Sequence, residues 1–250
     1  MHYLFAPLCV LSVCGAWAAQ PAGVPPVPAQ YPPAHRVDVV DDYHGVQVAD
    51  PFRWLEDDRS EETAAWVRAQ NELTQAYLAG SPLREAIRES LTQLWNYERY
   101  SLPSKKGSNY FYSKNNGLQP QSVLYVATSP KDEGQVLLDP NTLKADGTAA
   151  LAGTSVSHDG KLLAYAIADS GSDWNIWKVR DVATGRDLGD ELRWIKFSGA
   201  SWAKDGSGVL YSRFEEPEGG VMARSVNENP RLHFHRLGQK QEDDALIYKR

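Results

Sequence analysis

The feature that most constrains the fold is a turn motif that recurs along the second half of the sequence. The segment Ser157–Tyr165 carries an Asp-Gly pair followed by an apolar, strand-like run, and Trp202–Tyr211 repeats this pattern. The two glycines, Gly160 and Gly206, lie 46 residues apart, and a weaker copy of the motif occupies Lys106–Tyr112. An Asp-Gly pair favours a tight hairpin because glycine readily adopts positive φ. A strand–turn–strand unit that repeats about every 45–50 residues is typical of the four-stranded blades of a β-propeller.

Further strand-like segments fit the same interpretation. Between the two clear copies, the apolar run Trp174–Val179 leads into a turn at Asp181–Arg186, as expected of the outer half of a blade. Residues 100–250 have room for about three blades, whereas a closed propeller needs at least four. We therefore expect a mainly β fold, with an incomplete β-propeller domain over 100–250 that belongs to a longer protein. A β-sandwich with the same turn spacing is the alternative.

Residues 34–99 are predicted to form a helical segment in front of the propeller. A capping box at Asp58–Glu61 predicts the start of a helix, and Gly80 predicts its end. Pro82 then predicts the first turn of a second helix. The apolar stripes are Trp66, Ala69, Leu73, Ala76 and Tyr77 in the first helix, and Leu83, Ile87, Leu91, Leu94 and Trp95 in the second. Two such helices cannot bury these stripes alone, so they need a further partner surface.

The first eighteen residues have the pattern of a secretory signal peptide. Leu4–Trp17 is apolar but too short to span a bilayer comfortably, and Ala16-Trp17-Ala18 is an A-x-A cleavage site. A Pro/Ala-rich linker over 19–33 follows. We expect a secreted or periplasmic protein whose mature chain begins near Ala19. The alternatives are a start codon assigned upstream of a cytosolic protein and a lipoprotein anchored at Cys14.

Composition and charge exclude several classes of function. Both cysteines, Cys9 and Cys14, lie in this leader, so the expected mature chain has no disulfide, thiolate nucleophile or Cys-based metal site. The net charge of −6 gives no electrostatic reason to bind nucleic acid. No other segment approaches the roughly 18 apolar residues of a membrane span, so no membrane association is expected.

The sequence also lacks the common motifs of catalysis. It contains no G-x-S-x-G nucleophile elbow, P-loop, Rossmann glycine fingerprint or H-E-x-x-H motif. His233 and His235 would place two imidazoles on one face of a strand, but no third ligand follows at a suitable spacing, so a structural strand is favoured. We therefore expect no catalytic residue, no metal and no cofactor in this chain.

An ordered series of short motifs runs from about residue 31 to the end of the chain. It opens with Asp42-Tyr43-His44-Gly45, followed by Val48–Asp57. Further members are Lys106–Tyr112, Gly117–Tyr125, Leu138–Asn141, Asp169–Trp174, Ile195–Ser198 and Phe234–Gly238. In its members and in their order, this series resembles the prolyl oligopeptidase family of serine peptidases.

The resemblance implies a seven-bladed propeller that covers an α/β-hydrolase domain, with the N-terminal helical segment packed on the hydrolase domain. It also implies hydrolysis of proline-containing oligopeptides, with the propeller gating access of the substrate. The catalytic Ser, Asp and His of the family lie in the C-terminal hydrolase domain, which is missing here, so none is assigned to this chain. The implied partners are short proline-containing peptides and the missing hydrolase domain, and the protein is expected to be a monomer.

Two positions are expected to contribute to substrate binding. Phe197 matches a propeller phenylalanine that, in the family, lines the pocket for the substrate residue upstream of proline. Asp173 matches an acidic residue at the propeller–hydrolase interface, near a substrate-contacting arginine of the other domain. The alternatives are a core aromatic for Phe197 and a turn-capping role for Asp173. For the whole chain, the alternatives are a non-catalytic propeller that binds peptides or proteins, or another branch of the same peptidase superfamily.

Overall fold

The computed structural model describes residues 30–169, 171–216 and 227–249. The predicted signal peptide, both cysteines and most of the predicted linker over 19–33 lie outside the described residues. The chain divides into two compact units, residues 1–52 with 59–88 and residues 53–58 with 89–250. The domain boundaries expected from the sequence remain predictions.

The first unit contains a β-hairpin where the sequence led us to expect helix. Strands β1 (Val40–Tyr43) and β2 (Val46–Ala49) pair antiparallel. The two residues between them, His44 and Gly45, have φ values of 58° and 89°. Two successive left-handed residues give a hairpin turn whose twist matches that of the paired strands, which explains why this segment is not helical.

The two predicted helices are present, although their starts differ from the prediction. Helix α1 covers Glu61–Ala79 and helix α2 covers Arg84–Trp95. Ser60, not Asp58, caps α1, because its hydroxyl accepts a hydrogen bond from the Thr63 amide at 3.1 Å. The predicted capping box is therefore wrong by two residues: the residue directly before the helix reaches the free amide of its first turn.

The two helices differ in how well their predicted ends and apolar stripes match the structure. Gly80 is the C-cap of α1 as predicted, whereas α2 begins two residues after Pro82 rather than at it. Four of the five predicted stripe residues of α1 are partly buried, all except Ala76. The predicted stripe of α2 is exposed along its whole length. No helix within the described residues is long and apolar enough to cross a membrane.

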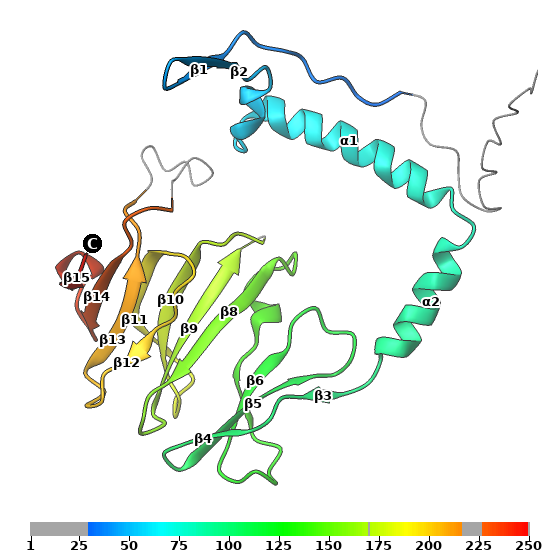
Figure 1. Ribbon diagram of the computed structural model, residues 1–250. Coiled ribbons are helices and arrows are strands. Elements are labelled where there is room, and N and C mark those ends of the chain that lie inside the picture. The colour runs from blue at the N-terminus through cyan, green and yellow to red at the C-terminus, as the bar shows by residue number, and fades with distance from the viewer. Residues whose placement is uncertain (1–29, 170, 217–226, 250) are drawn as a thin grey trace, which may run out of the picture. The chain divides into compact units, whose positions relative to one another are not determined.

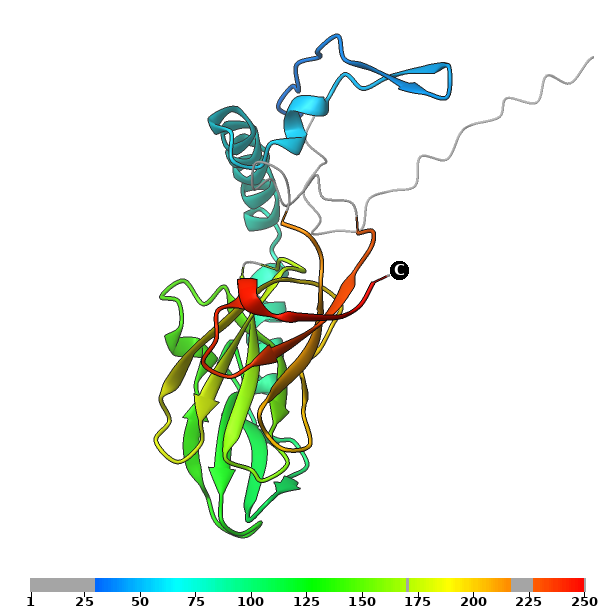
Figure 2. The same ribbon diagram turned by 90° about the vertical axis from the view of Figure 1, so that its left-hand side faces the viewer.

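The second unit, as far as it is described, consists mainly of three antiparallel sheets that follow one another along the chain (Figures 1 and 2). The first sheet has the order β3-β5-β6-β7 with β4 also paired to β5, the second has β11-β10-β9-β8, and the third has β12-β13-β14-β15. The strands of the first sheet are β3 (Arg99–Tyr100), β4 (Ser104–Lys106), β5 (Asn109–Asn115), β6 (Val123–Ala127) and β7 (Gln135–Leu138). Those of the second are β8 (Ala149–Val156), β9 (Leu162–Asp169), β10 (Asn175–Asp181) and β11 (Asp187–Ile195). Those of the third are β12 (Ser201–Trp202), β13 (Gly208–Arg213), β14 (Arg231–Arg236) and β15 (Ala245–Tyr248).

This arrangement confirms the expectation of a mainly β fold. Short 3-10 helices at Arg53–Glu56, Pro140–Thr142 and Gln241–Asp243 lie between the larger elements. The run predicted at Trp174–Val179 corresponds to β10, and the turn after it connects β10 to β11.

The recurring glycine turns join the first strands of each sheet, as the sequence predicted. Gly107, Gly160 and Gly206 lie between β4 and β5, β8 and β9, and β12 and β13, with φ values of 55°, 77° and 74°. The carboxylates of Asp159 and Asp205 each accept from the amide two residues further on, at 3.1 and 3.0 Å. The motif therefore marks one structural position in three consecutive sheets.

The core lies between neighbouring sheets, and β9 is buried on both faces. Leu163 and Tyr165 belong to the apolar cluster shared with the first sheet, whereas Ala164 and Ala166 belong to the cluster shared with the third. This division follows from the alternation of side chains along a strand. The cluster between the second and third sheets consists of Ala164, Ala166, Trp177, Val179, Leu192, Ile195, Ala200, Trp202, Val209 and Tyr211.

Candidate functional site

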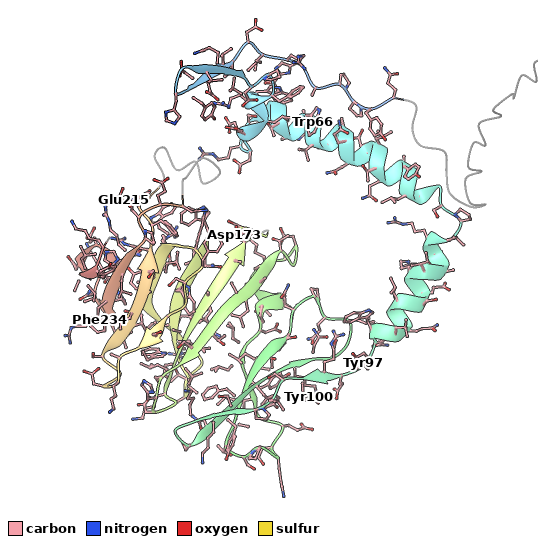
Figure 3. The ribbon with its side chains drawn as sticks, viewed as in Figure 1. Trp66, Tyr97, Tyr100, Asp173, Glu215 and Phe234 are labelled. Atoms are coloured by element: carbon pink, nitrogen blue, oxygen red, sulfur yellow. The ribbon has the colours of Figure 1, made fainter. Side chains whose placement is uncertain are left out.

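The two residues predicted to contact substrate lie at the same end of the second sheet. Asp173 is in the connection from β9 to β10, and Phe197 is in the connection from β11 to β12. In an antiparallel sheet these connections leave from the end opposite to the β8–β9 and β10–β11 turns. Figure 3 shows Asp173 at the upper end of this sheet. The topology thus brings together two residues that are 24 positions apart in the sequence.

Asp173 and Phe197 line one open hollow of about 550 Å³. Its other walls come from β8, the end of β9, the start of β10 and the two connections. They are Ala152, Gly153, Thr154, Ser155, Ala168, Ser172, Asn175, Trp177, Ser198, Gly199 and Ala200. The side chain of Phe197 is 72% exposed, which does not fit a core aromatic. Ser172, not Asp173, supplies the side-chain oxygen for the Trp174 amide, at 3.1 Å. The hollow therefore combines an exposed aromatic ring with an exposed carboxylate, a mixture suited to a peptide side chain and a cation.

Two polar atoms under this hollow have no hydrogen-bond partner among the described residues. They are the Asn175 side-chain oxygen and the Trp177 indole nitrogen, both fully buried. Gly153 packs directly on the indole, because a Cβ there would lie 3.1 Å from the ring carbons of Trp177. Buried polar atoms usually bind a protein group or an ordered water, and these two atoms are exceptions to that rule.

A second group of polar residues joins neighbouring sheets at their outer strands. The Tyr165 hydroxyl donates to the Asp187 carboxylate at 2.9 Å, and Arg180 donates to the same carboxylate at 2.7 Å. Arg180 also donates to the Leu137 carbonyl of the first sheet at 2.7 Å. Burial and the hydrogen bond to Asp187 raise the pKa of Tyr165 to about 12, so its hydroxyl stays protonated as a donor.

The same arrangement recurs one sheet later, with histidine as the cation. The Tyr211 hydroxyl donates to Asp244 at 2.6 Å, and the two ring nitrogens of His235 lie 2.7 Å from Asp244 and 3.0 Å from Asp190 of the second sheet. His235 is fully buried. Carboxylates only accept hydrogen bonds, so both ring nitrogens must carry a proton. Burial lowers the pKa of His235, but the hydrogen bonds to Asp244 and Asp190 outweigh it and leave the pKa above its ordinary value.

The sequence carries a local signal for these clusters. Tyr112, Tyr165 and Tyr211 each follow the glycine of a turn motif by five residues. In the first sheet, the Tyr112 hydroxyl donates to the Glu133 carbonyl. A tyrosine five residues after the turn glycine thus marks a strand position in each sheet. Its hydroxyl donates a hydrogen bond to another segment of the same sheet or of its connections.

These histidines are poorly suited to catalysis or metal binding. Both ring nitrogens of His235 are engaged by carboxylates, and Nδ1 of His233 donates to the Arg231 carbonyl at 3.0 Å. Among the described residues, no three His, Cys, Asp or Glu side chains are grouped as a metal site requires. The two histidines act as parts of the strand packing.

Comparison with known proteins then decides the family. Residues 32–250 match the family model described as the N-terminal β-propeller domain of prolyl oligopeptidase. The chain belongs to the prolyl oligopeptidase family. It is 44% identical over 218 residues to a prolyl endopeptidase from Elizabethkingia meningoseptica, covering 87% of this chain and 31% of that protein. It is 36% identical over 248 residues to the dual-function macrocyclase-peptidase POPB of Galerina marginata, covering 89% of this chain and 34% of that one.

Solved structures of the family agree with this assignment. A substrate-bound structure of prolyl oligopeptidase B from Galerina marginata aligns with a TM-score of 0.70 at 32% identity, over 90% of this chain and 34% of that chain. The chain therefore spans about a third of the length of the relatives that it matches. The matched third is the propeller portion of the family, so the resemblance inferred from the sequence motifs is confirmed.

Proposed function

We propose that this chain is the N-terminal part of a serine-type prolyl oligopeptidase that hydrolyses proline-containing oligopeptides through a covalent acyl-enzyme. The match to the propeller domain over residues 32–250 and the 44% identity to a prolyl endopeptidase support this proposal. In the complete protein, the three sheets would be part of a seven-bladed propeller that gates access to the substrate. The catalytic Ser, Asp and His would lie on a C-terminal α/β-hydrolase domain.

The main support for a role of particular residues is that Asp173 and Phe197 line the same hollow. The exposed ring of Phe197 would contact the substrate side chain upstream of proline. The carboxylate of Asp173 would face the hydrolase domain and attract the substrate-contacting arginine of that domain. Both roles require side chains that are accessible at one end of the sheet, as these two are.

The exposed stripe of α2 supports the proposed hydrolase partner. Leu83, directly before the helix, and Ile87, Leu91, Leu94 and Trp95 within it are each at least 50% exposed. Apolar burial is worth roughly 25 cal/mol per Å², so a continuous stripe of large side chains is unfavourable in water. Packing of this helix on a hydrolase domain would cover the stripe.

Activity of two proteins tests the proposed function. We expect the product of the complete reading frame that contains this chain to cleave a chromogenic Gly-Pro substrate, and residues 1–250 alone to cleave none. Turnover by purified residues 1–250 that is lost on substitution within this chain would refute the proposal. Peptide binding by the complete product without any hydrolysis would favour the non-catalytic propeller instead.

We further propose that the protein is exported and that residues 1–18 are its signal peptide. The support is the apolar run that ends in Ala16-Trp17-Ala18. N-terminal sequencing of the exported product should give a chain that begins near Ala19. A product that retains Met1 and occurs only in the cytosol would contradict the proposal.

A further inference from the structure

The end of β11 and the connection after it, which carries Phe197, have an unusual backbone. Trp194 and Phe197 have φ values of 63° and 55°, although neither is glycine. The left-handed region is rare for bulky residues and is strained for each of them. Such a conformation persists only where the surrounding structure holds it. The contacts around this connection therefore decide whether Phe197 stays exposed over the hollow.

Trp174 is the centre of those contacts. Its ring meets Trp194 edge-on, with centroids 5.8 Å apart, and meets Phe214 edge-on at 6.1 Å. The Lys196 ammonium lies over the Trp174 ring, 4.0 Å from its centroid. A cation over the face of an indole is attracted by its quadrupole, and tryptophan is the strongest of the aromatic partners. One side chain thus contacts Trp194, Lys196 and Phe214 at the same time.

Hydrogen bonds hold the same connection on either side of Phe197. The Phe214 amide donates to the Trp194 carbonyl at 2.9 Å, and the Ser212 amide donates to the Ser198 hydroxyl at 3.0 Å. The Lys196 ammonium also donates to the Asn227 side chain at 3.0 Å. The third sheet therefore fixes the two flanks of the connection, and Trp174 fixes its centre through Lys196.

Trp174 also sits in the connection that carries Asp173. The residues before and after it, Asp173 and Asn175, both line the hollow. The contact between Lys196 and Trp174 therefore joins the two connections that contribute the predicted substrate-binding residues.

We propose that Trp174 and Lys196 are positioning residues that hold Phe197 exposed and fix it relative to Asp173, and that they act on peptide binding only through Phe197. The role in peptide binding rests on the proposed function; the ordering of the connection does not. We call the Lys196–Trp174 contact the latch.

Hydrogen exchange tests the latch without reference to any substrate. The Lys196→Met variant keeps the aliphatic stem but removes the charge, and Lys196→Arg restores a cation that stacks on tryptophan. Lys105→Met is the matched control, because Lys105 lies 5.6 Å over Tyr110 in the first sheet. We expect the Ser212 and Phe214 amides to exchange about 2- to 30-fold faster in Lys196→Met, but not in Lys105→Met or Lys196→Arg.

Peptide affinity tests whether the latch acts through Phe197. The probe is a fluorescein-labelled pentapeptide with phenylalanine two residues before its proline, and its anisotropy is read with the full chain. We expect Lys196→Met to weaken binding about 2- to 30-fold, and to have no further effect when Phe197→Ala is already present. Lys105→Met should bind like the unsubstituted chain.

Each outcome separates the latch from the proposed function. Unchanged exchange in Lys196→Met refutes the latch, even if the chain binds the peptide. Equal weakening by Lys196→Met with and without Phe197 refutes action through that ring. If the unsubstituted chain does not bind the peptide while exchange responds as expected, the latch orders the connection, but the proposed peptide site and the affinity role are both refuted.

Discussion

The glycines of the recurring turns provide a sharp test of what holds adjacent sheets together. Gly160 and Gly206 occupy the same position in two sheets and have nearly equal φ, 77° and 74°. Their surroundings differ, however. A Cβ on Gly160 would overlap the Lys106 carbonyl oxygen of the first sheet, whereas a Cβ on Gly206 would meet nothing within 4 Å. Replacement of each by alanine therefore separates backbone strain from the contact between sheets.

The expected magnitudes follow from these two terms. Alanine in the left-handed region costs roughly 1–2 kcal/mol, of which about 0.4–1 kcal/mol is offset by the reduced freedom of the unfolded chain. We expect Gly206→Ala to lower the free energy of unfolding by about 1 kcal/mol. Gly160→Ala adds an overpacking term of about 1–3 kcal/mol. It also displaces the Gly160 carbonyl, which accepts from the Asn109 side chain at 3.2 Å. A total of about 3–5 kcal/mol is expected for Gly160→Ala.

Thermal unfolding of the two variants beside the unsubstituted chain measures the difference. A loss of 1 kcal/mol lowers Tm by about 2–4 °C in a protein of this size. Gly206→Ala should therefore lower Tm by about 2–4 °C and Gly160→Ala by about 6–20 °C. Gly107→Ala is a second check, because a Cβ there would overlap the Asp159 carbonyl oxygen across the same junction. Equal shifts for Gly160 and Gly206 would show that the turns of the first two sheets are not packed as described.

Three further predictions concern pH, a buried hydroxyl and the candidate site. His235 has a raised pKa in the folded chain, so its stabilising contribution is complete below about pH 6.5 and is lost as pH rises through the folded pKa. Tm should therefore fall over that range in the unsubstituted chain but not in His235→Gln. If the plots of Tm against pH are parallel for the two proteins, His235 is not protonated on both ring nitrogens in the folded chain. Tyr165→Phe should lower the free energy of unfolding by about 1–3 kcal/mol in urea denaturation, because it removes the hydrogen bond from a buried hydroxyl to the charged, partly exposed Asp187 carboxylate; an unchanged midpoint would show that the hydroxyl is not used. In the complete peptidase, Phe197→Ala should raise KM with kcat nearly intact and lower kcat/KM about 5- to 150-fold. If kcat/KM falls equally for short and long peptides and Tm is also lowered, the ring belongs to the core instead.

Local chain chemistry accounts for most of what the sequence predicted correctly. The turns at Gly107, Gly160 and Gly206 have positive φ, as their sequence motif requires. Helix α1 and its end at Gly80 follow from apolar spacing and a terminating glycine. The hairpin turn at His44-Gly45 also has a local signal, although residues 34–99 as a whole are predicted to be helical.

The family could likewise be recognised from the order of short motifs, which the match over residues 32–250 confirms. Two site residues, Phe197 and Asp173, were named from that resemblance, and the structure places them on one hollow. Their roles in binding remain predictions, since shared geometry does not measure affinity.

Contacts between residues that are distant in sequence were decided only by the tertiary structure. His233 and His235 were expected on one strand face, but the sequence did not reveal that Asp190, 45 residues earlier, would meet the second imidazole. Nor did it reveal the left-handed backbone of Phe197, because bulky residues adopt that conformation only when neighbouring elements hold it. Hydrophobic period and turn chemistry act over a few residues and fix strands and turns. Which strands become neighbours, and hence which carboxylate meets which cation, depends on how the sheets pack.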